Sequence, residues 1–471
     1  MQSEGYPDSG TGPNVAYWQS VSVSAPATCA APSASPALGP AAMAAPATCA
    51  AVSVYPTEPS FATVTLNYKG QGLSSSIHVS VEKDSSFPLG LNATLRAKGT
   101  KEFTKTLDLQ PSEDGVSTVQ LNVTLDCATG KCNQPGGTQL PMNYGLTVVA
   151  HSGSYTQDSV LQLQLLNAKW LVMLYCASDS SLQGYMGGDV LEMAAASKAN
   201  DNPAVGILVL FHTEVTSASF PGNAVQPIGT NALYKVANGT ITRVGNIWPE
   251  TNIFDPATLQ KFLTTSMGMV PADRNQLILG DHGRGIQGFG YGGVNSMSIN
   301  QLATALTGTS QKLEILSFDA CLMAQIEALY ELRGYTAYFT ASERTVPGPG
   351  YDYNGFITSL LKNPDQSTAA YLNVIVSTYR AKYMTPEYQE DQPHKIIPTL
   401  AAINSSQLGG VVSGLSNLSR VLVQDYGGHN PQFNSTMLQV LKNTVRSDGG
   451  GSTLDIRSLA QNLILNPQIT D

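Results

Sequence analysis

Six short apolar runs follow Ala168, and segments with the composition of helices separate them. Each run is apolar along its whole length, which is typical of strands that are buried on both faces of a sheet. Helical crossovers usually join such strands, which then lie parallel. We expect strands at 170–175, 205–211, 276–280, 313–318, 337–341 and 396–403, with helices at 189–197, 257–266, 299–306, 322–332 and 368–383. Residues 169–471 are therefore predicted to form an α/β domain with a doubly wound, mostly parallel sheet.

A different pattern covers residues 51–168. Polar and apolar residues alternate there in short runs, and turn residues separate the runs. Alternation with a period of two is typical of strands with one buried face. The expected strands are 62–68, 76–81, 117–125, 145–150 and 159–165. This segment is predicted to be an all-β sandwich of immunoglobulin-like type, in which His78 and His151 are structural.

Residues 1–50 are rich in Ala, Pro and Ser and carry almost no charge. This composition predicts an extended arm and no packed unit. Two roles fit such an arm: a linker, or a propeptide that crosses an active site.

The surface chemistry favours an extracellular or cell-surface protein. Charged residues make up 13% of the 471 residues and the net charge is −9, so no basic stripe can neutralise phosphates and we expect no nucleic-acid partner. Glycosylation triplets begin at Asn92, Asn122, Asn238, Asn404, Asn417 and Asn434. A surface solvated by hydroxyls, amides and sugars is typical of exported proteins. We recognise no signal peptide and no transmembrane segment in the sequence.

The six cysteines fall into three groups. Cys29 and Cys49 lie in duplicated Ala-Pro-Ala-Thr-Cys-Ala segments, and Cys127 and Cys132 flank a short turn with a glycine, so each pair is predicted to form a local disulfide. Cys176 lies in an apolar strand and is predicted to be a small buried hydrophobe. Cys321 differs because of where it stands in the α/β pattern.

The segment 277–293, LILGDHGRGIQGFGYGG, contains a G-x-G-x-x-G pattern from Gly283 to Gly288. A dinucleotide-binding loop needs a helix after its third glycine and an acidic residue about 20 positions further on. Gly288 is followed by Phe-Gly-Tyr-Gly-Gly, and the residues about 20 positions beyond Gly283 include neither Asp nor Glu. We therefore do not expect nucleotide binding. The glycines instead allow backbone N–H groups to approach a substrate carbonyl beside His282.

Cys321 follows the next expected strand, and an amphipathic segment that is typical of a helix begins directly after it. The positive end of a helix dipole favours thiolate, so we expect a lowered thiol pKa. The strand that carries His282 precedes the strand of Cys321 and is expected to be its neighbour in the sheet. The pattern therefore predicts a nucleophilic cysteine that is paired with a histidine.

The same residues resemble those of a known family. Asp281-His282-Gly283 and Asp319-Ala320-Cys321 match the D-H-G and D-x-C patterns, each after an apolar strand, of the clostripain-like cysteine peptidases, family C11 of clan CD. Residues 170–193, 252–262 (NIFDPATLQKF) and 341–351 also resemble family segments. The resemblance covers about residues 169–465 and implies a caspase-like fold.

The resemblance implies that Cys321 attacks the scissile carbonyl and that His282 generates the thiolate or protonates the leaving amine. Backbone N–H groups of Gly283 and Cys321 are expected to hold the oxyanion. Asp281 is expected to shape the loop, because its side chain points to the opposite face of the strand. No cofactor is required and no metal ligand set is expected, although calcium dependence occurs in the family. The partner is a protein or peptide substrate.

In the family, the Asp two positions before the nucleophile lines the S1 pocket, so Asp319 implies a preference for Arg or Lys at P1. A second acidic residue is expected in the P-G-x-G loop, where this chain has Pro349. Glu343 and Asp352 are the candidates to replace it.

Family members are often zymogens that cleave themselves, and Lys169, at the junction of the two predicted domains, is the expected cleavage site. The alternative to a secreted endopeptidase is a cell-surface binding or adhesion protein with a vestigial peptidase domain.

Overall fold

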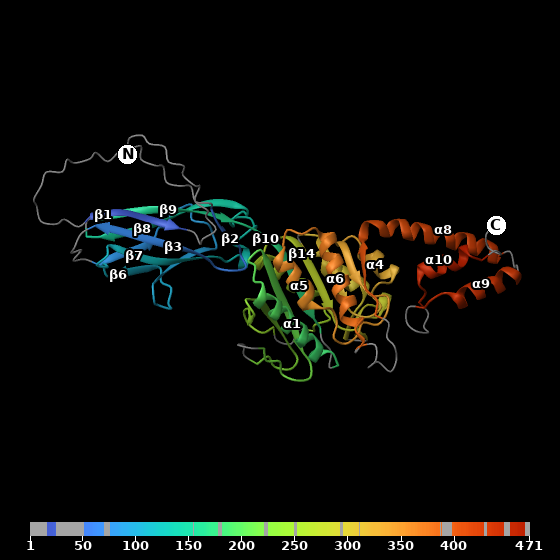
Figure 1. Cartoon of the computed structure of the whole chain (residues 1–471). Coiled ribbons are helices and arrows are strands. Elements are labelled where there is room, and N and C mark those ends of the chain that lie inside the picture. Colours follow the sequence, from blue (N-terminus) through green and yellow to red (C-terminus); the bar gives the residue numbers. More distant parts are fainter. Residues whose placement is uncertain are drawn as a thin grey trace, which may run out of the picture. The chain divides into compact units, whose positions relative to one another are not determined.

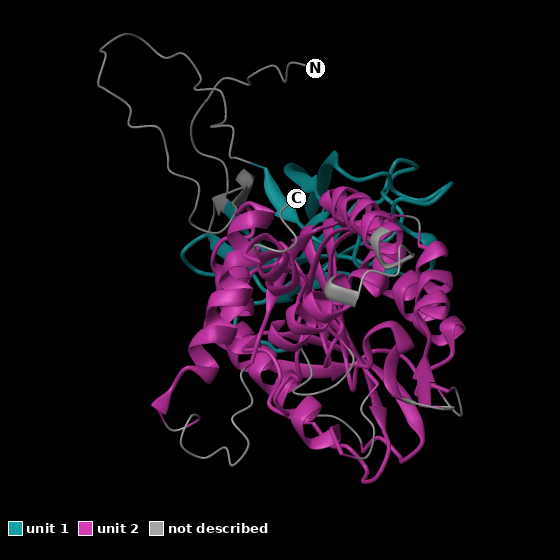
Figure 2. Cartoon of the chain, turned by 90° about the vertical axis from the view of Figure 1, so that its right-hand side faces the viewer, with its two compact units in different colours: residues 1–168, 268–271 teal, residues 169–267, 272–471 magenta. Residues whose placement is uncertain are grey.

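The computed structural model describes residues 17–24, 51–69, 76–153, 155–177, 181–220, 225–248, 252–292, 295–309, 311–386, 388, 398–427, 431–446 and 453–466. The chain divides into two compact units. Residues 1–168 and 268–271 form the first unit, and residues 169–267 and 272–471 form the second (Figure 2).

The first unit contains two β-sheets (Figure 1). The four-stranded sheet has the order β1-β3-β7-β5 and consists of β1 (Tyr17–Ser24), β3 (Ser60–Lys69), β7 (Val116–Leu125) and β5 (Leu91–Ala97). The five-stranded sheet has the order β2-β9-β8-β4-β6 and consists of β2 (Val52–Val54), β9 (Tyr155–Leu165), β8 (Met142–Ser152), β4 (Ile77–Val81) and β6 (Thr106–Leu109). Alternate residues of both sheets, among them Val64, Leu121 and Leu146, are fully or almost fully buried in one core. The period-two pattern thus marks the buried faces.

Two details differ from the expectations for this region. Strand β1 lies within the segment predicted as an unpaired arm and pairs antiparallel with β3, so that prediction is wrong for residues 17–24. The short β2 pairs parallel with β9. Two sheets around one core fit a sandwich, and the immunoglobulin-like type stays a prediction.

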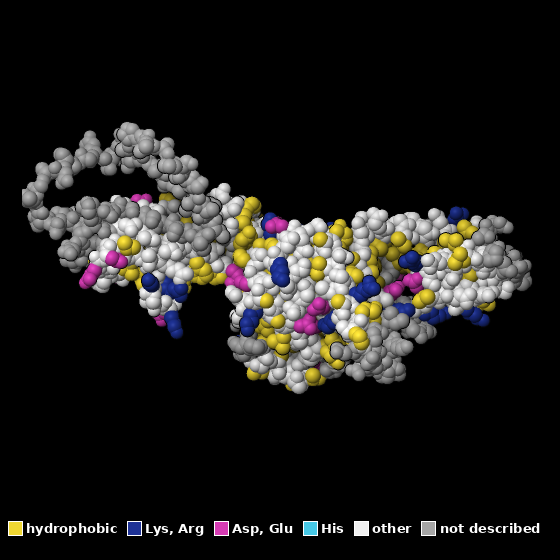
Figure 3. Space-filling view, in the orientation of Figure 1, with side chains coloured by type: hydrophobic (Ala, Val, Ile, Leu, Met, Phe, Trp, Pro, Cys, Tyr) yellow, Lys and Arg dark blue, Asp and Glu magenta, His cyan; other side chains and the backbone are white. Residues whose placement is uncertain are grey.

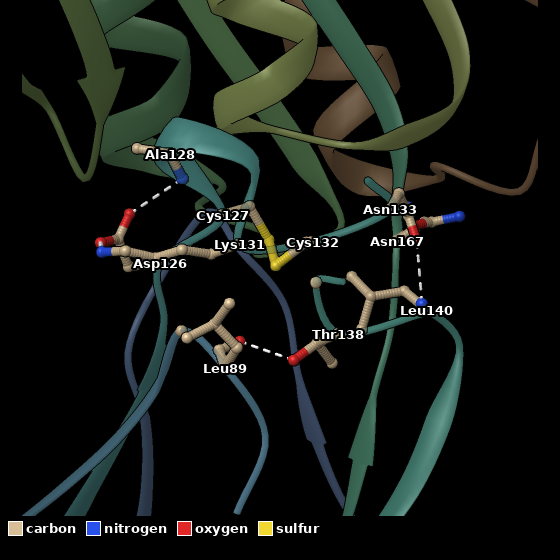
Figure 4. Close-up of a disulfide and its surroundings, with 12 residues drawn as sticks. Leu89, Asp126, Cys127, Ala128, Lys131, Cys132, Asn133, Thr138, Leu140 and Asn167 are labelled. Carbon is tan, nitrogen blue, oxygen red and sulfur yellow. Dashed lines mark hydrogen bonds and ion pairs between the residues drawn. A yellow bond between two sulfur atoms is a disulfide. The ribbon is translucent and has the colours of Figure 1, made fainter. Parts of the chain in front are cut away.

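The predicted disulfide between Cys127 and Cys132 is confirmed (Figure 4). Both residues are buried, and neighbouring hydrogen bonds hold the loop around them, such as the 2.6 Å bond from the Thr138 hydroxyl to the Leu89 carbonyl. Cys29 and Cys49 lie outside the described residues.

An eight-stranded sheet with the order β13-β12-β11-β10-β14-β17-β18-β19 organises the second unit. Its strands are β10 (Ala168–Cys176), β11 (Val205–Thr213), β12 (Thr230–Ala237), β13 (Thr240–Arg243), β14 (Ala272–Gly280), β17 (Leu313–Asp319), β18 (Thr336–Ala341) and β19 (Ala401–Asn404). The pairs β10–β11, β14–β17 and β17–β18 are parallel. Strands β12, β13 and β19 run antiparallel to their neighbours at the two edges. The α/β prediction is confirmed, but the sheet is mixed.

The antiparallel edge has a simple local cause. Asn238 and Gly239 join β12 to β13, and both have positive φ values, 53° and 72°. This is the geometry of a two-residue hairpin turn, for which Asn-Gly is the preferred sequence. The Asn-Gly pair was therefore a signal for the two strands that the sequence analysis missed.

Helices lie on both faces of this sheet. The helices are α1 (Gln183–Ala199), α2 (Pro256–Met269), α3 (Ile299–Thr307), α4 (Ile326–Leu332), α5 (Tyr353–Lys362), α6 (Thr368–Tyr383), α8 (Leu408–Gly427), α9 (Pro431–Asn443) and α10 (Ile456–Ile464). Trp170, Val172 and Leu174 of β10 share one core with α1, α5 and α6, which are neighbours in Figure 1. Tyr175 points to the other face, where its ring packs against Phe262 of α2 at 5.5 Å. Cys176 is fully buried, as predicted.

The charge distribution agrees with the composition. On the face seen in Figure 3, Lys and Arg side chains are scattered among uncharged ones. Among the described residues, every helix is too short or too polar to span a bilayer.

Candidate active site

The parallel neighbours β14 and β17 end side by side. Their register pairs Gly280 with Asp319, and the Asp281 N–H donates to the Asp319 carbonyl at 3.3 Å. His282 lies two residues after Gly280, and Cys321 lies two residues after Asp319. The sheet therefore brings the predicted histidine and cysteine to the same edge, as the strand order from the sequence required.

Gly283 lies directly against the Cys321 turn. A Cβ atom on Gly283 would fall far inside van der Waals contact of the Cys321 carbonyl oxygen and would also crowd Met323 and Ala320. Only glycine fits there. The contact joins the His282 loop to the cysteine turn without a side chain between them.

The glycines after His282 form a small hairpin of β15 (Phe289–Gly292) and β16 (Asn295–Met297), preceded by the 3₁₀ turn Gly285–Gln287. The His282 carbonyl accepts from the Gly290 N–H at 2.7 Å, and the Arg284 N–H donates to the Gly288 carbonyl at 2.9 Å. Gly288 leads into a strand and not into a helix. The rejection of a dinucleotide-binding loop is thus supported by the local structure.

Cys321 lies in a turn and not at a helix N-terminus. Helix α4 begins only at Ile326, and Leu322 adopts a φ of +64°, which a leucine rarely does. The turn is held by bonds from the Leu322 N–H to the Arg344 carbonyl, 3.0 Å, and from the Ala324 N–H to the Ser342 carbonyl, 2.9 Å. The predicted helix start at Leu322 is wrong because these bonds to the β18 loop replace the first helical turn. The expected stabilisation of thiolate by a helix dipole is lost with it.

The Cys321 thiol is partly buried, and burial raises its pKa. The negative charge of Asp319 acts in the same direction, while the Val346 N–H, 3.3 Å from Sγ, lowers the pKa. Burial dominates, so the prediction of a lowered thiol pKa is wrong. A neutral thiol needs a base before it can attack, which makes the position of His282 decisive.

Three groups hold His282. Its own backbone N–H donates to the Asp281 carboxylate at 2.7 Å, so Asp281 shapes the loop as expected. Its Nε2 lies 3.0 Å from the Ser181 hydroxyl. The centroid of its ring lies 5.3 Å from the centroid of the Tyr291 ring, in a T-shaped arrangement. The contact with Ser181 helps to orient the imidazole. The sequence analysis missed Ser181, although it follows β10, whose end lies at the same edge of the sheet.

Asp319 is almost completely buried at the end of β17. One carboxylate oxygen accepts from the Tyr351 N–H at 3.1 Å and from the Tyr353 hydroxyl at 2.9 Å. Burial raises the pKa of Asp319 to about 6, although these two bonds and the charge of Lys382 lower it. A buried carboxylate has lost its hydration, so pairing with a cation stabilises its ionised form.

Glu343 and Asp352, the candidates for a second acidic residue, have different surroundings. Glu343 lines a cavity of about 530 Å³ together with residues of α4, α8 and α10, and Asp319 is not among the lining residues. Burial and the neighbouring Asp455 raise the pKa of Glu343. Asp352 is the N-cap of α5 and accepts from the Gly355 N–H at 2.9 Å. Glu343 thus lies at a cavity that Asp319 does not line, whereas Asp352 lies between Tyr351 and Tyr353, the two residues that donate to Asp319. Among the described residues, no three His, Cys, Asp or Glu side chains are grouped as metal ligands.

Lys169 does not lie in a loop. It is the second residue of β10, its N–H donates to the Ala204 carbonyl at 2.7 Å, and its ammonium pairs with Asp273 and Asp365. A peptidase needs an accessible, extended segment, so a cut after Lys169 in the folded chain is no longer expected.

A thiol and an imidazole at neighbouring strand ends of an α/β sheet form the arrangement that cysteine hydrolases use. The model of the clostripain family, Peptidase_C11, matches residues 174–468, and the chain belongs to this family. Clostripain of Hathewaya histolytica is 27% identical over 220 residues, which are 40% of this chain and 41% of clostripain. The chain thus matches about two fifths of the length of that relative.

Solved structures of other C11 proteases are among those similar to this chain. A secreted C11 cysteine protease from Bacteroides thetaiotaomicron, in complex with an irreversible peptide inhibitor, is 21% identical with a TM-score of 0.48, covering 64% of this chain and 80% of that one. An inactive zymogen C11 protease from Parabacteroides distasonis is 19% identical with a TM-score of 0.46 and the same coverage.

Proposed function

We propose that this protein is a secreted cysteine endopeptidase that uses Cys321 and His282. The observation that carries the proposal is the pairing of β14 with β17, which brings the two residues to one sheet edge with Gly283 packed against the Cys321 turn. Membership of the clostripain family favours this function over the alternative of a surface-binding protein with a vestigial domain.

In the proposed reaction, His282 acts first as a general base. The raised pKa of Cys321 means that the thiol keeps its proton at neutral pH, so the imidazole of His282 takes this proton as Sγ attacks the scissile carbonyl carbon. The tetrahedral intermediate collapses when the C–N bond breaks and His282 gives the proton to the leaving amine. Water, deprotonated by His282, then attacks the thioester and releases the carboxylate product and the free thiol.

The N–H groups of Gly283 and Cys321 are the proposed oxyanion donors. In the bridge between the His282 loop and the hairpin, the hydrogen bonds are made by the His282 carbonyl and the Arg284 N–H, and not by the Gly283 N–H. Removing one such donor from a peptidase costs about 100- to 1000-fold in kcat.

Asp319 is the proposed partner of a basic P1 side chain. Its carboxylate is buried two residues before the nucleophile, and its pKa of about 6 leaves it ionised at neutral pH. Pro349 supplies no second charge, so the preference for Arg or Lys rests on this one residue.

A panel of fluorogenic peptides that differ only at P1 tests the activity, with Cys321→Ala as the control. The proposal expects turnover of the Arg and Lys peptides by the wild type and none by the variant. Absence of turnover on every peptide would favour the alternative, a cell-surface binding protein with a vestigial peptidase domain.

Self-processing is part of the same proposal. Sequencing the N-termini of an incubated sample beside Cys321→Ala tests it, and equal fragments from both proteins would exclude self-cleavage. The proposed reaction needs no cofactor. Calcium dependence occurs in the family, and assays with and without a chelator test whether this protein shares it.

A further inference from the structure

The loop of residues 346–351 contacts both the nucleophile and the proposed specificity residue. At one end, the Val346 N–H donates to Cys321 Sγ at 3.3 Å. At the other end, the Tyr351 N–H donates to Asp319 at 3.1 Å. Gly350, with a φ of +56°, packs so closely on the Asp319 carboxylate that no side chain fits. The loop therefore presents its amides to the site.

The carbonyls of the same loop are held by the end of α6. The Lys382 ammonium donates to the Pro349 carbonyl at 2.6 Å and to the Tyr351 carbonyl at 2.8 Å. The hydroxyl of Tyr383 donates to the Gly350 carbonyl at 2.6 Å. Three successive carbonyls are thus bound by two adjacent side chains.

Lys382 is itself fixed by a third partner. Its ammonium lies 3.5 Å from Glu192 of α1, and the other oxygen of Glu192 accepts from the Tyr353 N–H at 3.0 Å. The three partners match the three donors of an ammonium group. The Lys382 side chain is 21% exposed, so these bonds are partly shielded from water.

We propose that Lys382 is a positioning residue for substrate binding. By holding the carbonyls of residues 349 and 351 toward α6, it keeps the amides of the loop aimed at Cys321 and Asp319. This inference rests on the proposed function, because it assumes that Asp319 binds the P1 side chain. Lys382 itself does not touch the reacting atoms.

The test compares Lys382→Met, which keeps the length of the side chain but removes its charge and donors, with Arg380→Met. Arg380 is exposed on the same helix and serves as the matched control. Two measurements are made. The first is hydrogen exchange of the four amides of the loop, at Val346, Gly348, Gly350 and Tyr351. The second is KM and kcat for a P1-Arg peptide. Loss of charge-assisted hydrogen bonds is expected to speed exchange by about 10-fold and to raise KM by about 10-fold, with kcat changed much less. Arg380→Met should change neither quantity.

The two measurements separate this inference from the function on which it rests. Unchanged exchange in Lys382→Met overturns the positioning role, whether or not the wild type cleaves peptides. Faster exchange with an unchanged KM overturns the claim that the loop serves substrate binding. Failure of the wild type on every peptide refutes the proposed function, and exchange alone then decides whether Lys382 holds the loop.

A second variant covers the case in which Lys382→Met fails to fold. Tyr383→Phe removes the hydroxyl that donates to the Gly350 carbonyl and keeps the buried ring. A smaller change of the same kind, faster exchange and a higher KM, supports the inference. Exchange and KM that both equal the wild-type values would count against it.

Discussion

Replacing Asp319 with asparagine separates binding from stability. The carboxyl is buried and holds its proton up to a pH of about 6, compared with about 3.8 for an ordinary Asp. In the native state near neutral pH it is therefore an ionised group with little water around it. Function and stability make opposite demands on this one side chain, because only the ionised form pairs with a basic substrate.

The magnitude follows from the pKa. A rise from 3.8 to about 6 corresponds to about 3 kcal/mol of native-state stability that is lost at pH 7. Well below pH 3.8 the carboxyl is protonated in both the folded and the unfolded state, and stability is lost as the pH rises from there through about 6. The amide oxygen of Asp319→Asn keeps an acceptor for Tyr351 and Tyr353. We expect the variant to melt several degrees higher than the wild type at pH 7.5, with a smaller difference at pH 4.5.

Activity should change in the other direction. Loss of the charge partner of a P1-Arg side chain costs about 3 kcal/mol, or about 100-fold in kcat/KM. A P1-Ala peptide should be affected much less. Thermal unfolding at both pH values and kinetics with the two peptides measure these effects. A stability control is Asp352→Ala, which removes the α5 cap and should cost about 1 kcal/mol of stability.

This reasoning is refuted if Asp319→Asn lowers the melting temperature and also lowers activity on the P1-Arg and P1-Ala peptides to the same extent. It would mean that Asp319 only holds the loop through Tyr351 and Tyr353. Unchanged cleavage of the P1-Arg peptide would instead show that the P1 charge is bound by another group.

Three further predictions concern the cysteine and the histidine. Because burial raises the pKa of Cys321, its alkylation rate by iodoacetamide should still be rising at pH 9, and a plateau near pH 7 would show a preformed thiolate. Ser181→Ala should lower kcat by about 10-fold at an unchanged melting temperature, because His282 loses the partner of Nε2; an unchanged kcat would mean that the ring is oriented without it. Gly283→Ala should abolish turnover, since its Cβ would collide with the Cys321 carbonyl, and wild-type turnover would show that the two turns separate easily.

Those parts of the fold and site that follow from strand order and local pattern were predictable from the sequence. Five of the six apolar runs predicted strands inside the sheet, and the neighbouring positions of β14 and β17 placed the segments of His282 and Cys321 side by side. The sixth run, 396–403, lies partly outside the described residues, and its end belongs to the edge strand β19. The disulfide between Cys127 and Cys132 followed from their short spacing. These inferences needed no knowledge of distant contacts.

The errors have a common physical cause, which is tertiary contact. The helix predicted from Leu322 is replaced by a turn because Ser342 and Arg344 supply carbonyls to its N–H groups. The thiol pKa of Cys321 is set by burial and not by the helix that the sequence suggested. Lys169 was the expected cleavage site, but it lies in β10 and its ammonium pairs with Asp273 and Asp365. No local sequence pattern indicated a role for Ser181 or Lys382, because each contacts residues that are distant in the sequence: His282 for Ser181, and the carbonyls of Pro349 and Tyr351 for Lys382.

The central claim is that Cys321 is a nucleophile activated by His282, and covalent labelling tests it most directly. The protein is treated with a peptide that carries Arg at P1 and an electrophilic ketone, and the modified residue is located by mass spectrometry in the wild type and in His282→Ala. The account predicts one adduct, on Cys321, in the wild type and at least about 100-fold slower labelling in the variant. Labelling of Cys321 at equal rates in both proteins, or no adduct on Cys321, would contradict it.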